Sequence, residues 1–152
     1  MAGGDAREGA WSRRTYPAMV ALHCSVIGGT ALLGGRARWP WLAVLAAAQP
    51  MRAWVLMTLG PRWNARAAVS PTMEVATEGP YAYVRHPNYV VVFVELLALP
   101  LAFGLQRLAW GAATAHAAIL AVRIRDEEAL LALTAGYDDH FRTKKRFIPG
   151  LF

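Results

Sequence analysis

Residues 39–59 read WPWLAVLAAAQPMRAWVLMTL, and Arg52 is the only charged side chain in this run. A helix needs roughly 20 mostly apolar residues to cross the hydrocarbon layer of a bilayer. Tryptophans near both ends of the run suit the two membrane interfaces. Gln49 and Pro50 interrupt the apolar character, and Pro50 removes a helical hydrogen bond. The stretch therefore predicts a transmembrane helix that is kinked or partly unwound near Pro50.

Three further apolar stretches lie on either side of this run, at Tyr16–Leu33, Asn88–Gly104 and Leu108–Ile124. The helical pattern of the last one continues to Leu131, because no Gly or Pro interrupts it before Gly136. This helix should therefore leave the membrane and carry its carboxylates into the headgroup zone. The sequence predicts an all-α integral membrane protein of about four transmembrane helices, with a C-terminal helical extension in the cytosol.

Composition supports a bilayer as the surrounding solvent. The chain has 152 residues, enough for one domain over residues 1–152, and 56% of them are hydrophobic against 17% charged. Residues 1–14 are expected to be disordered. The formal charge of +6 comes from basic residues between and after the apolar runs, where they would meet anionic lipid rather than nucleic acid. The single Cys24 excludes an internal disulfide and offers no metal cluster.

The Lys and Arg residues predict the orientation of the helices. With four spans, twelve of these residues fall on one side of the membrane and three on the other. The positive-inside rule then places both termini in the cytosol. The loop 60–87 and the tail from Ile124 onward share that face. We expect a multi-pass protein of the inner membrane, with its charged motifs gathered on the cytosolic side.

The densest group of polar and aromatic residues is TEGPYAYVRHPNY, residues 77–89. Pro87 suits the first position of a helix, where its missing N–H would be unpaired anyway. His86 then precedes this helix beside Arg85. The unpaired N–H groups and positive dipole of a helix start, with these two side chains, suit a carboxylate or phosphate. The alternative interpretation is a positively charged anchor with interfacial tyrosines.

A second group, RIRDEEAL, occupies residues 123–130. Arg123 and Glu127 are four residues apart and share a helix face. The paired acids Glu127 and Glu128 could hold a ribose diol or an ammonium group. The alternative is a solvated helix end with ion pairs along it.

Glu95 lies inside the third apolar stretch, nine residues beyond His86 and so roughly 13 Å down the helix. Ionisable residues at that depth are expensive and indicate a function or a paired partner. Arg52 is the candidate partner because it also lies inside a span. The sequence leaves three roles for Glu95 open, namely a structural pair, a substrate contact and a general base. His23 and His116, alone on apolar faces, are interpreted as buried hydrogen-bonding residues.

The chain contains no Gly-x-Gly-x-x-Gly pattern, phosphate loop, zinc-ligand spacing or Gly-x-Ser-x-Gly pattern. Motif and hydropathy together exclude a soluble nucleotide-binding fold. A cofactor would have to be held at the cytosolic face by helix ends.

Several short motifs in the last half of the chain occur together in a specific order and spacing. They are Gly79-Pro80-Tyr81, Val84-Arg85-His86-Pro87-Asn88-Tyr89, Arg123-Ile124-x-x-Glu127-Glu128, Gly136-Tyr137 and Arg146-Phe147-Ile148-Pro149-Gly150. In these motifs the chain resembles the isoprenylcysteine carboxyl methyltransferase family, which is related to membrane phospholipid methyltransferases.

The resemblance implies a membrane methyltransferase whose S-adenosylmethionine is bound by residues 77–152, between the last two helices and the C-terminal segment. The matching positions give a set of expected cofactor-binding residues: Tyr81, Arg85, His86, Tyr89, Arg123, Glu127 and Glu128.

A further resemblance concerns the acceptor. Leu59-Gly60-x-x-Trp63-Asn64 after Arg52-x-Trp54, with Glu95 downstream, looks like a bacterial branch associated with type III polyketide synthases, whose members O-methylate alkylpyrones or alkylresorcinols. This implies a lipophilic small-molecule acceptor, contacted by Arg52, Trp54 and Asn88. The sulfonium methyl would pass in line to an oxygen. An acidic hydroxypyrone or a carboxylate needs no base, whereas a phenol would need one, and Glu95 and His86 are then the catalytic candidates.

Three alternatives stay open from the sequence. The acceptor could be a phospholipid or an isoprenylcysteine in the same architecture. The Arg-His-Pro-Asn-Tyr string also resembles that of NADPH-dependent intramembrane sterol-type reductases, although this chain is short and carries Glu127-Glu128 where those enzymes differ. The third alternative is a non-enzymatic membrane protein whose motifs are interfacial anchors.

Overall fold

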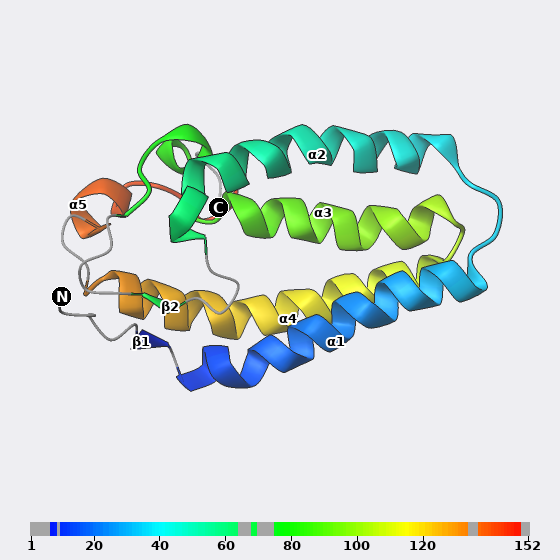
Figure 1. Cartoon of the computed structure of the whole chain (residues 1–152), viewed down its shortest axis with the longest axis horizontal. Helices are drawn as coiled ribbons and strands as arrows, with labels where there is room; N and C mark the ends of the chain where they lie inside the picture. Colours follow the sequence, from blue (N-terminus) through cyan, green and yellow to red (C-terminus); the bar gives the residue numbers. More distant parts are fainter. Residues whose placement is uncertain (1–6, 9, 64–67, 70–74, 134–136, 150–152) are drawn as a thin grey trace.

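The computed structural model describes residues 7–8, 10–63, 68–69, 75–133 and 137–149. Within them, four long helices run side by side along the molecule (Figure 1): α1 (Ala10–Leu33), α2 (Trp39–Leu59), α3 (Pro87–Ala102) and α4 (Gln106–Leu131). The short elements are the 3-10 turns η1 (Gly60–Arg62) and η2 (Gly79–Ala82), helix α5 (Tyr137–Phe141), and the antiparallel pair of strands β1 (Arg7–Glu8) and β2 (Ala68–Val69). The chain is a helical bundle, as its hydropathy predicted.

The helix bounds follow the apolar runs closely. Helix α2 has the predicted limits and continues through Pro50 without unwinding. Helix α4 extends to Leu131, as predicted from the absence of Gly and Pro. Helix α1 differs, because it begins at Ala10 rather than Tyr16. No Gly or Pro lies between these two residues, so the helix can continue toward the N-terminus. Of the first 14 residues, 1–6 and 9 lie outside the described part.

Two helical segments in the described residues, Arg13–Leu33 and Trp39–Arg62, are long and apolar enough to cross a membrane. The third apolar helix, α3, is shorter than such a span. Helix α4 is longer but ends in charged residues. The structure thus establishes two candidate membrane-spanning helices within a bundle of four.

The bundle is held together by apolar contacts along its length. Helix α3 packs between α2 and α4, and α1 packs mainly against α4. Val26, Leu96 and Ala112 form a buried cluster where α1, α3 and α4 meet. Large apolar side chains point outward elsewhere, with Leu32 being 85% exposed. Such a surface suits lipid better than water.

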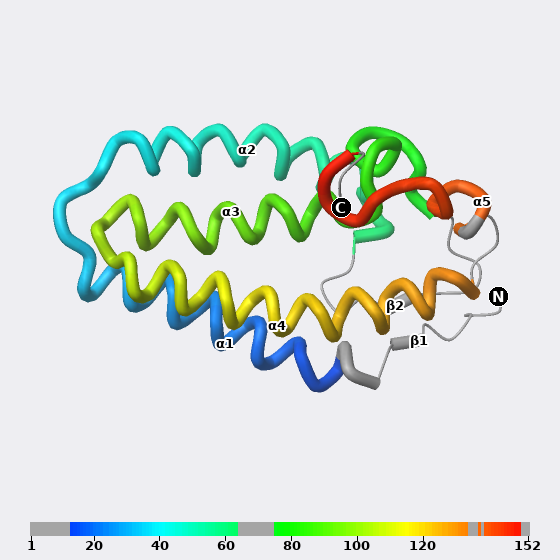
Figure 2. The backbone as a smooth tube through the Cα atoms, turned by 180° about the vertical axis from the view of Figure 1, so that it is seen from behind, coloured from blue at the N-terminus to red at the C-terminus, as the bar shows by residue number. Residues whose placement is uncertain are grey.

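The two ends of the bundle differ in chemistry. At one end the α1–α2 and α3–α4 turns are joined by main-chain hydrogen bonds, from Gly35 N–H to the Phe103 carbonyl (2.9 Å) and from Arg38 N–H to the Ala102 carbonyl (2.7 Å). The opposite end carries η1, η2 and α5 and the charged end of α4 (Figures 1 and 2). The sequence motifs singled out above therefore meet at one end of the molecule.

Candidate functional site

The η2 turn begins the polar site and requires a glycine. Gly79 has φ +57°, which residues other than glycine rarely adopt. A Cβ atom at this position would also collide with the Thr58 hydroxyl and lie 3.1 Å from the Trp54 indole nitrogen of α2. The turn therefore packs directly on the end of α2. It leads into residues 83–86, which precede α3, and α3 begins at Pro87 as predicted.

The C-terminal segment Lys144–Ile148 lies along the residues that precede α3. Arg85 N–H donates to the Lys145 carbonyl (3.0 Å) and His86 N–H donates to the Arg146 carbonyl (2.9 Å). The Arg85 side chain adds a hydrogen bond from Nε to the Lys144 carbonyl (2.8 Å). These main-chain bonds fix the segment beside the start of α3, although it has no helix of its own to stabilise it.

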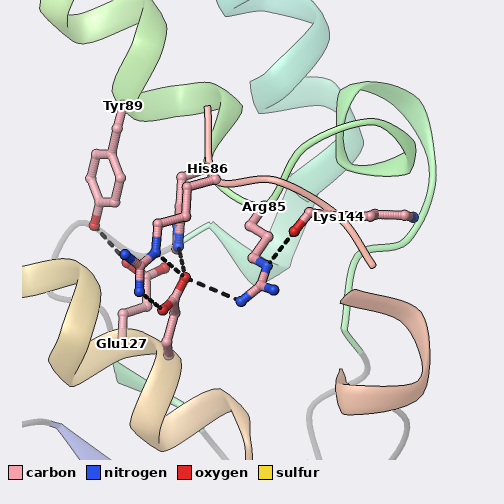
Figure 3. A network of polar contacts seen from close by, with 7 residues as sticks. Arg85, His86, Tyr89, Glu127 and Lys144 are labelled. Carbon is pink, nitrogen blue, oxygen red and sulfur yellow. Dashed lines mark hydrogen bonds and ion pairs between the residues drawn. The ribbon is translucent and has the colours of Figure 1, made fainter. Parts of the chain in front are cut away.

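Glu128 is the centre of an ion cluster, and Figure 3 labels two members of it, Arg85 and His86. Arg146 donates to both of its oxygens, from Nε at 3.0 Å and from Nη2 at 2.7 Å. His86 Nε2 lies 3.2 Å and Arg85 Nη1 lies 3.5 Å from its Oε1. Burial acts to raise the pKa of Glu128, but the hydrogen bonds and charges of His86 and Arg146 outweigh it and lower the pKa to about 2. Glu128 is therefore ionised at neutral pH.

The neighbouring Glu127 has a different environment. Its Oε2 accepts a hydrogen bond of 2.6 Å from the Tyr89 hydroxyl of α3 (Figure 3). The buried Arg123 lies close to the same hydroxyl. Burial raises the pKa of Tyr81, and the nearby charge of Glu127 raises it further. The rings of His86, which contacts Glu128, and Tyr89, which contacts Glu127, lie 5.5 Å apart.

The residues that precede α3 thus meet the acidic end of α4, through His86 and Glu128. The structure brings together all seven residues that the sequence assigned to a cofactor: Tyr81, Arg85, His86, Tyr89, Arg123, Glu127 and Glu128. Their contacts come from four parts of the chain, namely η2, the start of α3, the end of α4 and the C-terminal segment.

The residues expected to contact the acceptor or to act as a base are more dispersed. Glu95 forms an ion pair with Arg52, whose Nε donates at 2.7 Å, and it also accepts a hydrogen bond from Gln49 (3.0 Å). This cluster joins α2 to α3. Trp54 packs at the η2 turn. The amide oxygen of Asn88 is buried with no hydrogen-bond partner among the described residues.

The resemblance implied a part for the C-terminal segment, but sequence reasoning missed which of its residues make the contacts. Arg146 binds Glu128, and the Phe147 ring lies 6.4 Å from the His86 ring. Lys144 contacts the His140 ring and the Tyr81 carbonyl. The Arg146-Phe147-Ile148 string contributed to the family resemblance. Because Arg146 lies outside any helix or strand, its sequence position does not indicate which acid it pairs with.

An apolar groove of about 430 Å³ lies between α3 and α4, next to the ion cluster. Its walls are Val90, Phe93 and Val94 from α3, and Ala117, Leu120, Ala121, Ile124 and Arg125 from α4, with Tyr89, Arg146, Phe147 and Ile148 at the charged end. Its volume is in the usual range for ligand pockets, roughly 300–1,000 Å³. Tyr89 and Arg146 belong to both sites, since each binds one of the paired acids and also lines the groove.

Fold and site together define a small helical protein with two candidate membrane-spanning helices and a charged cluster at one bundle end. Residues 41–133 match the family model described as the isoprenylcysteine carboxyl methyltransferase (ICMT) family. The chain belongs to this family, and it is therefore a membrane methyltransferase of the isoprenylcysteine and phospholipid type.

Three curated relatives are similar to this chain over most of its length. The protein YpbQ of Bacillus subtilis (strain 168) is 34% identical over 76% of this chain and 73% of its own length. The nickel-cobalt-cadmium resistance protein NccN of Alcaligenes xylosoxydans xylosoxydans is 31% identical over 80% of this chain. A protein of Haemophilus influenzae (strain ATCC 51907 / DSM 11121 / KW20 / Rd) is 32% identical over 60% of this chain. The aligned regions cover 59% and 54% of the last two relatives.

Proposed function

We propose that this chain uses S-adenosylmethionine to methylate an oxygen of a lipophilic small molecule, of the alkylpyrone or alkylresorcinol kind. The observation that carries the proposal is the shared wall between the charged cluster and the apolar groove. Tyr89 and Arg146 contact the charged cluster and also line the groove, so a soluble cofactor at the cluster and a lipophilic acceptor in the groove would meet there. Family membership supports the methyl-transfer chemistry.

The side chains of the charged cluster fit S-adenosylmethionine. A sulfonium or amino group is cationic, and Glu127 offers a carboxylate with a tyrosine hydroxyl on one oxygen. The rings of His86 and Tyr89 add aromatic surface, which attracts cations. The start of α3 beside Arg85 suits the carboxylate of the cofactor. S-adenosylmethionine supplies an electrophilic methyl group, and the residues of this chain bind it, orient the acceptor and exclude water.

The groove supports an acceptor that arrives already ionised. Its walls are apolar along the bundle, but it ends at Arg125 and Arg146. The charge of Arg146 is matched by Glu128, so Arg125 is the cation that could attract an acceptor oxyanion. A hydroxypyrone or carboxylate would then need no general base. Within the bilayer, the alkyl tail would reach the groove laterally between helices.

The membrane arrangement extends the two candidate spans. We propose that α3 and the part of α4 up to Val122 also cross the bilayer, giving four spans with both termini in the cytoplasm. The apolar composition of α3 and the gathering of basic residues at one bundle end support this arrangement. The inner membrane of a bacterium is the proposed location.

Calorimetry with S-adenosylhomocysteine in detergent tests the cofactor site. Glu127→Gln and His86→Ala should each weaken binding about ten-fold or more, equivalent to about 1.4 kcal/mol, because each removes a polar contact. Asp139→Asn, an exposed acid of α5, is the matched control and should bind normally. Binding of NADPH with no binding of S-adenosylhomocysteine would indicate a reductase instead.

Incubation with labelled S-adenosylmethionine and a panel of acceptors tests the substrate. The panel holds an alkylpyrone, an alkylresorcinol, a prenylcysteine and phosphatidylethanolamine. We expect methyl transfer to the alkylpyrone, with Arg125→Gln raising its KM about ten-fold because a charge-assisted contact is lost. Arg107→Gln, at the other end of α4, is the control. Labelling of phosphatidylethanolamine or the prenylcysteine alone would contradict the proposed acceptor.

A further inference from the structure

We infer that the two adjacent acids, Glu127 and Glu128, have different roles. This inference rests on the proposed methyltransferase function. Glu127 meets the cofactor. Glu128 is a positioning residue that fixes the C-terminal segment Lys144–Ile148, and that segment in turn forms one wall of the acceptor groove. Glu128 thus acts on the acceptor side of the reaction through Arg146 rather than by touching the cofactor.

The first argument is the number of bonds that Glu128 already makes. Both of its oxygens accept hydrogen bonds from Arg146, and Oε1 also lies within 3.5 Å of nitrogen atoms of His86 and Arg85. Only 15% of its side chain is exposed. A carboxylate surrounded in this way has little capacity left for the hydroxyls of a ribose. Glu127, by contrast, accepts a hydrogen bond from the Tyr89 hydroxyl on one oxygen, Oε2.

The second argument is the position of the segment that Glu128 holds. Arg146, Phe147 and Ile148 line the groove, yet they lie in a part of the chain without regular structure. Main-chain bonds to Arg85 and His86 align the segment, and the Arg146–Glu128 pair ties it to α4. The ion pair therefore connects the two helices through the segment that closes the groove at its charged end.

The third argument is what the loss of Glu128 would leave behind. Three basic side chains would remain around an uncharged position, two of them mostly buried. Removing one partner of a buried ion pair leaves an uncompensated charge, which is far more destabilising than removing the whole pair. The segment, held on α4 by this cluster, is the part that can move away to relieve the repulsion.

Amide hydrogen exchange on the cofactor-free protein in detergent tests the inference. Glu128→Gln should speed exchange at the His86 amide, which donates to the Arg146 carbonyl, about ten-fold. Arg146→Gln should have the same effect, and the double variant should exchange no faster than either single one. Arg146 is the milder site to change, because 44% of its side chain is exposed and α4 keeps its sequence. Glu127→Gln should leave this exchange unchanged.

Acceptor kinetics give the second readout. Glu128→Gln should raise the acceptor KM more than it weakens S-adenosylhomocysteine binding, whereas Glu127→Gln should do the reverse. Unchanged exchange in Glu128→Gln, together with lost S-adenosylhomocysteine binding, would make Glu128 a direct cofactor ligand and overturn the inference. Because exchange is measured without cofactor or acceptor, failure of the proposed function would not alter that result.

Discussion

Glu127 and Glu128 are identical side chains at consecutive positions, but a helix turns them toward different neighbours. Glu127 meets a tyrosine of α3, and Glu128 meets basic groups from two segments. Their chemistry is therefore set by what surrounds them and not by the residue type. The sequence could indicate a pair of functional acids, but the distinction between the two depends on contacts with residues 38 and 18 positions away.

The lowered pKa of Glu128 predicts a dependence of stability on pH. The ordinary pKa of a glutamate is near 4.5, and in the folded protein it is about 2. The folded state therefore binds this proton more weakly than the unfolded state does, so the contribution of Glu128 is fully present above about pH 4.5. It is lost progressively as the pH falls toward 2. Above that range this group should cause no change.

Thermal unfolding in detergent between pH 6 and about pH 2.5 checks this prediction. The Tm should fall below about pH 4.5, and Glu128→Gln should remove part of that fall because it has no proton to bind. Glu127→Gln is the matched control at the next position. Parallel Tm curves for the Glu128→Gln variant and the unchanged protein would show that another group causes the acid sensitivity.

At the scale of the helices, the Arg52–Glu95 pair joins α2 to α3. The sequence left Glu95 with three possible roles, and the structure gives it an ion-pair partner and a hydrogen bond from Gln49. Both oxygens of Glu95 are bound by α2, Oε1 by Gln49 and Arg52 and Oε2 by Arg52. We therefore expect Glu95 to serve mainly in fixing α2 against α3.

A double-mutant cycle tests this role. Glu95→Gln alone should lower the Tm, because it leaves Arg52 without its carboxylate, and the double variant Arg52→Gln/Glu95→Gln should be less destabilised than the sum of the two single variants. S-adenosylhomocysteine affinity should stay within about two-fold in all of them, because the pair lies apart from the ion cluster. A large loss of turnover in Glu95→Gln with an unchanged Tm would instead indicate a general base.

The elements that the sequence predicted well are those with a long apolar signal. The limits of α2 were predicted without error, and those of α3 and α4 within two residues. The start of α1 was missed because the residues before Tyr16 are polar yet helical. The resemblance implied that the C-terminal segment lies at the cofactor site, but its contacts could not be predicted, because they depend on main-chain bonds to Arg85 and His86. Such bonds carry no side-chain pattern.

At the scale of the whole molecule, the charged site lies at one end and the joined turns at the other (Figure 2). This polarity predicts how the protein sits in the membrane. In a Cys24→Ser background, Ala37→Cys lies in the exposed turn before α2 and Thr143→Cys lies in the exposed segment after α5. If the charged end is cytoplasmic, a membrane-impermeant thiol reagent added to intact cells should label the first and not the second.

The same two variants provide the control in opened membranes, where both should be labelled. Labelling of Thr143→Cys alone in intact cells would reverse the proposed orientation. Labelling of both in intact cells would contradict a single charged face on the cytoplasmic side.

The main-chain bonds between the two turns at the far end, Gly35 to Phe103 and Arg38 to Ala102, limit how the bundle can deform. At the other end, the Tyr89–Glu127 hydrogen bond and the Arg146–Glu128 ion pair tie α3 and the C-terminal segment to α4, so the groove between α3 and α4 is held at both ends. An acceptor lying in this groove would keep its reacting group at the charged end, and extra methylene groups would extend along the apolar walls or out into lipid. Such an enzyme would tolerate acceptors of many tail lengths while discriminating sharply among their head groups.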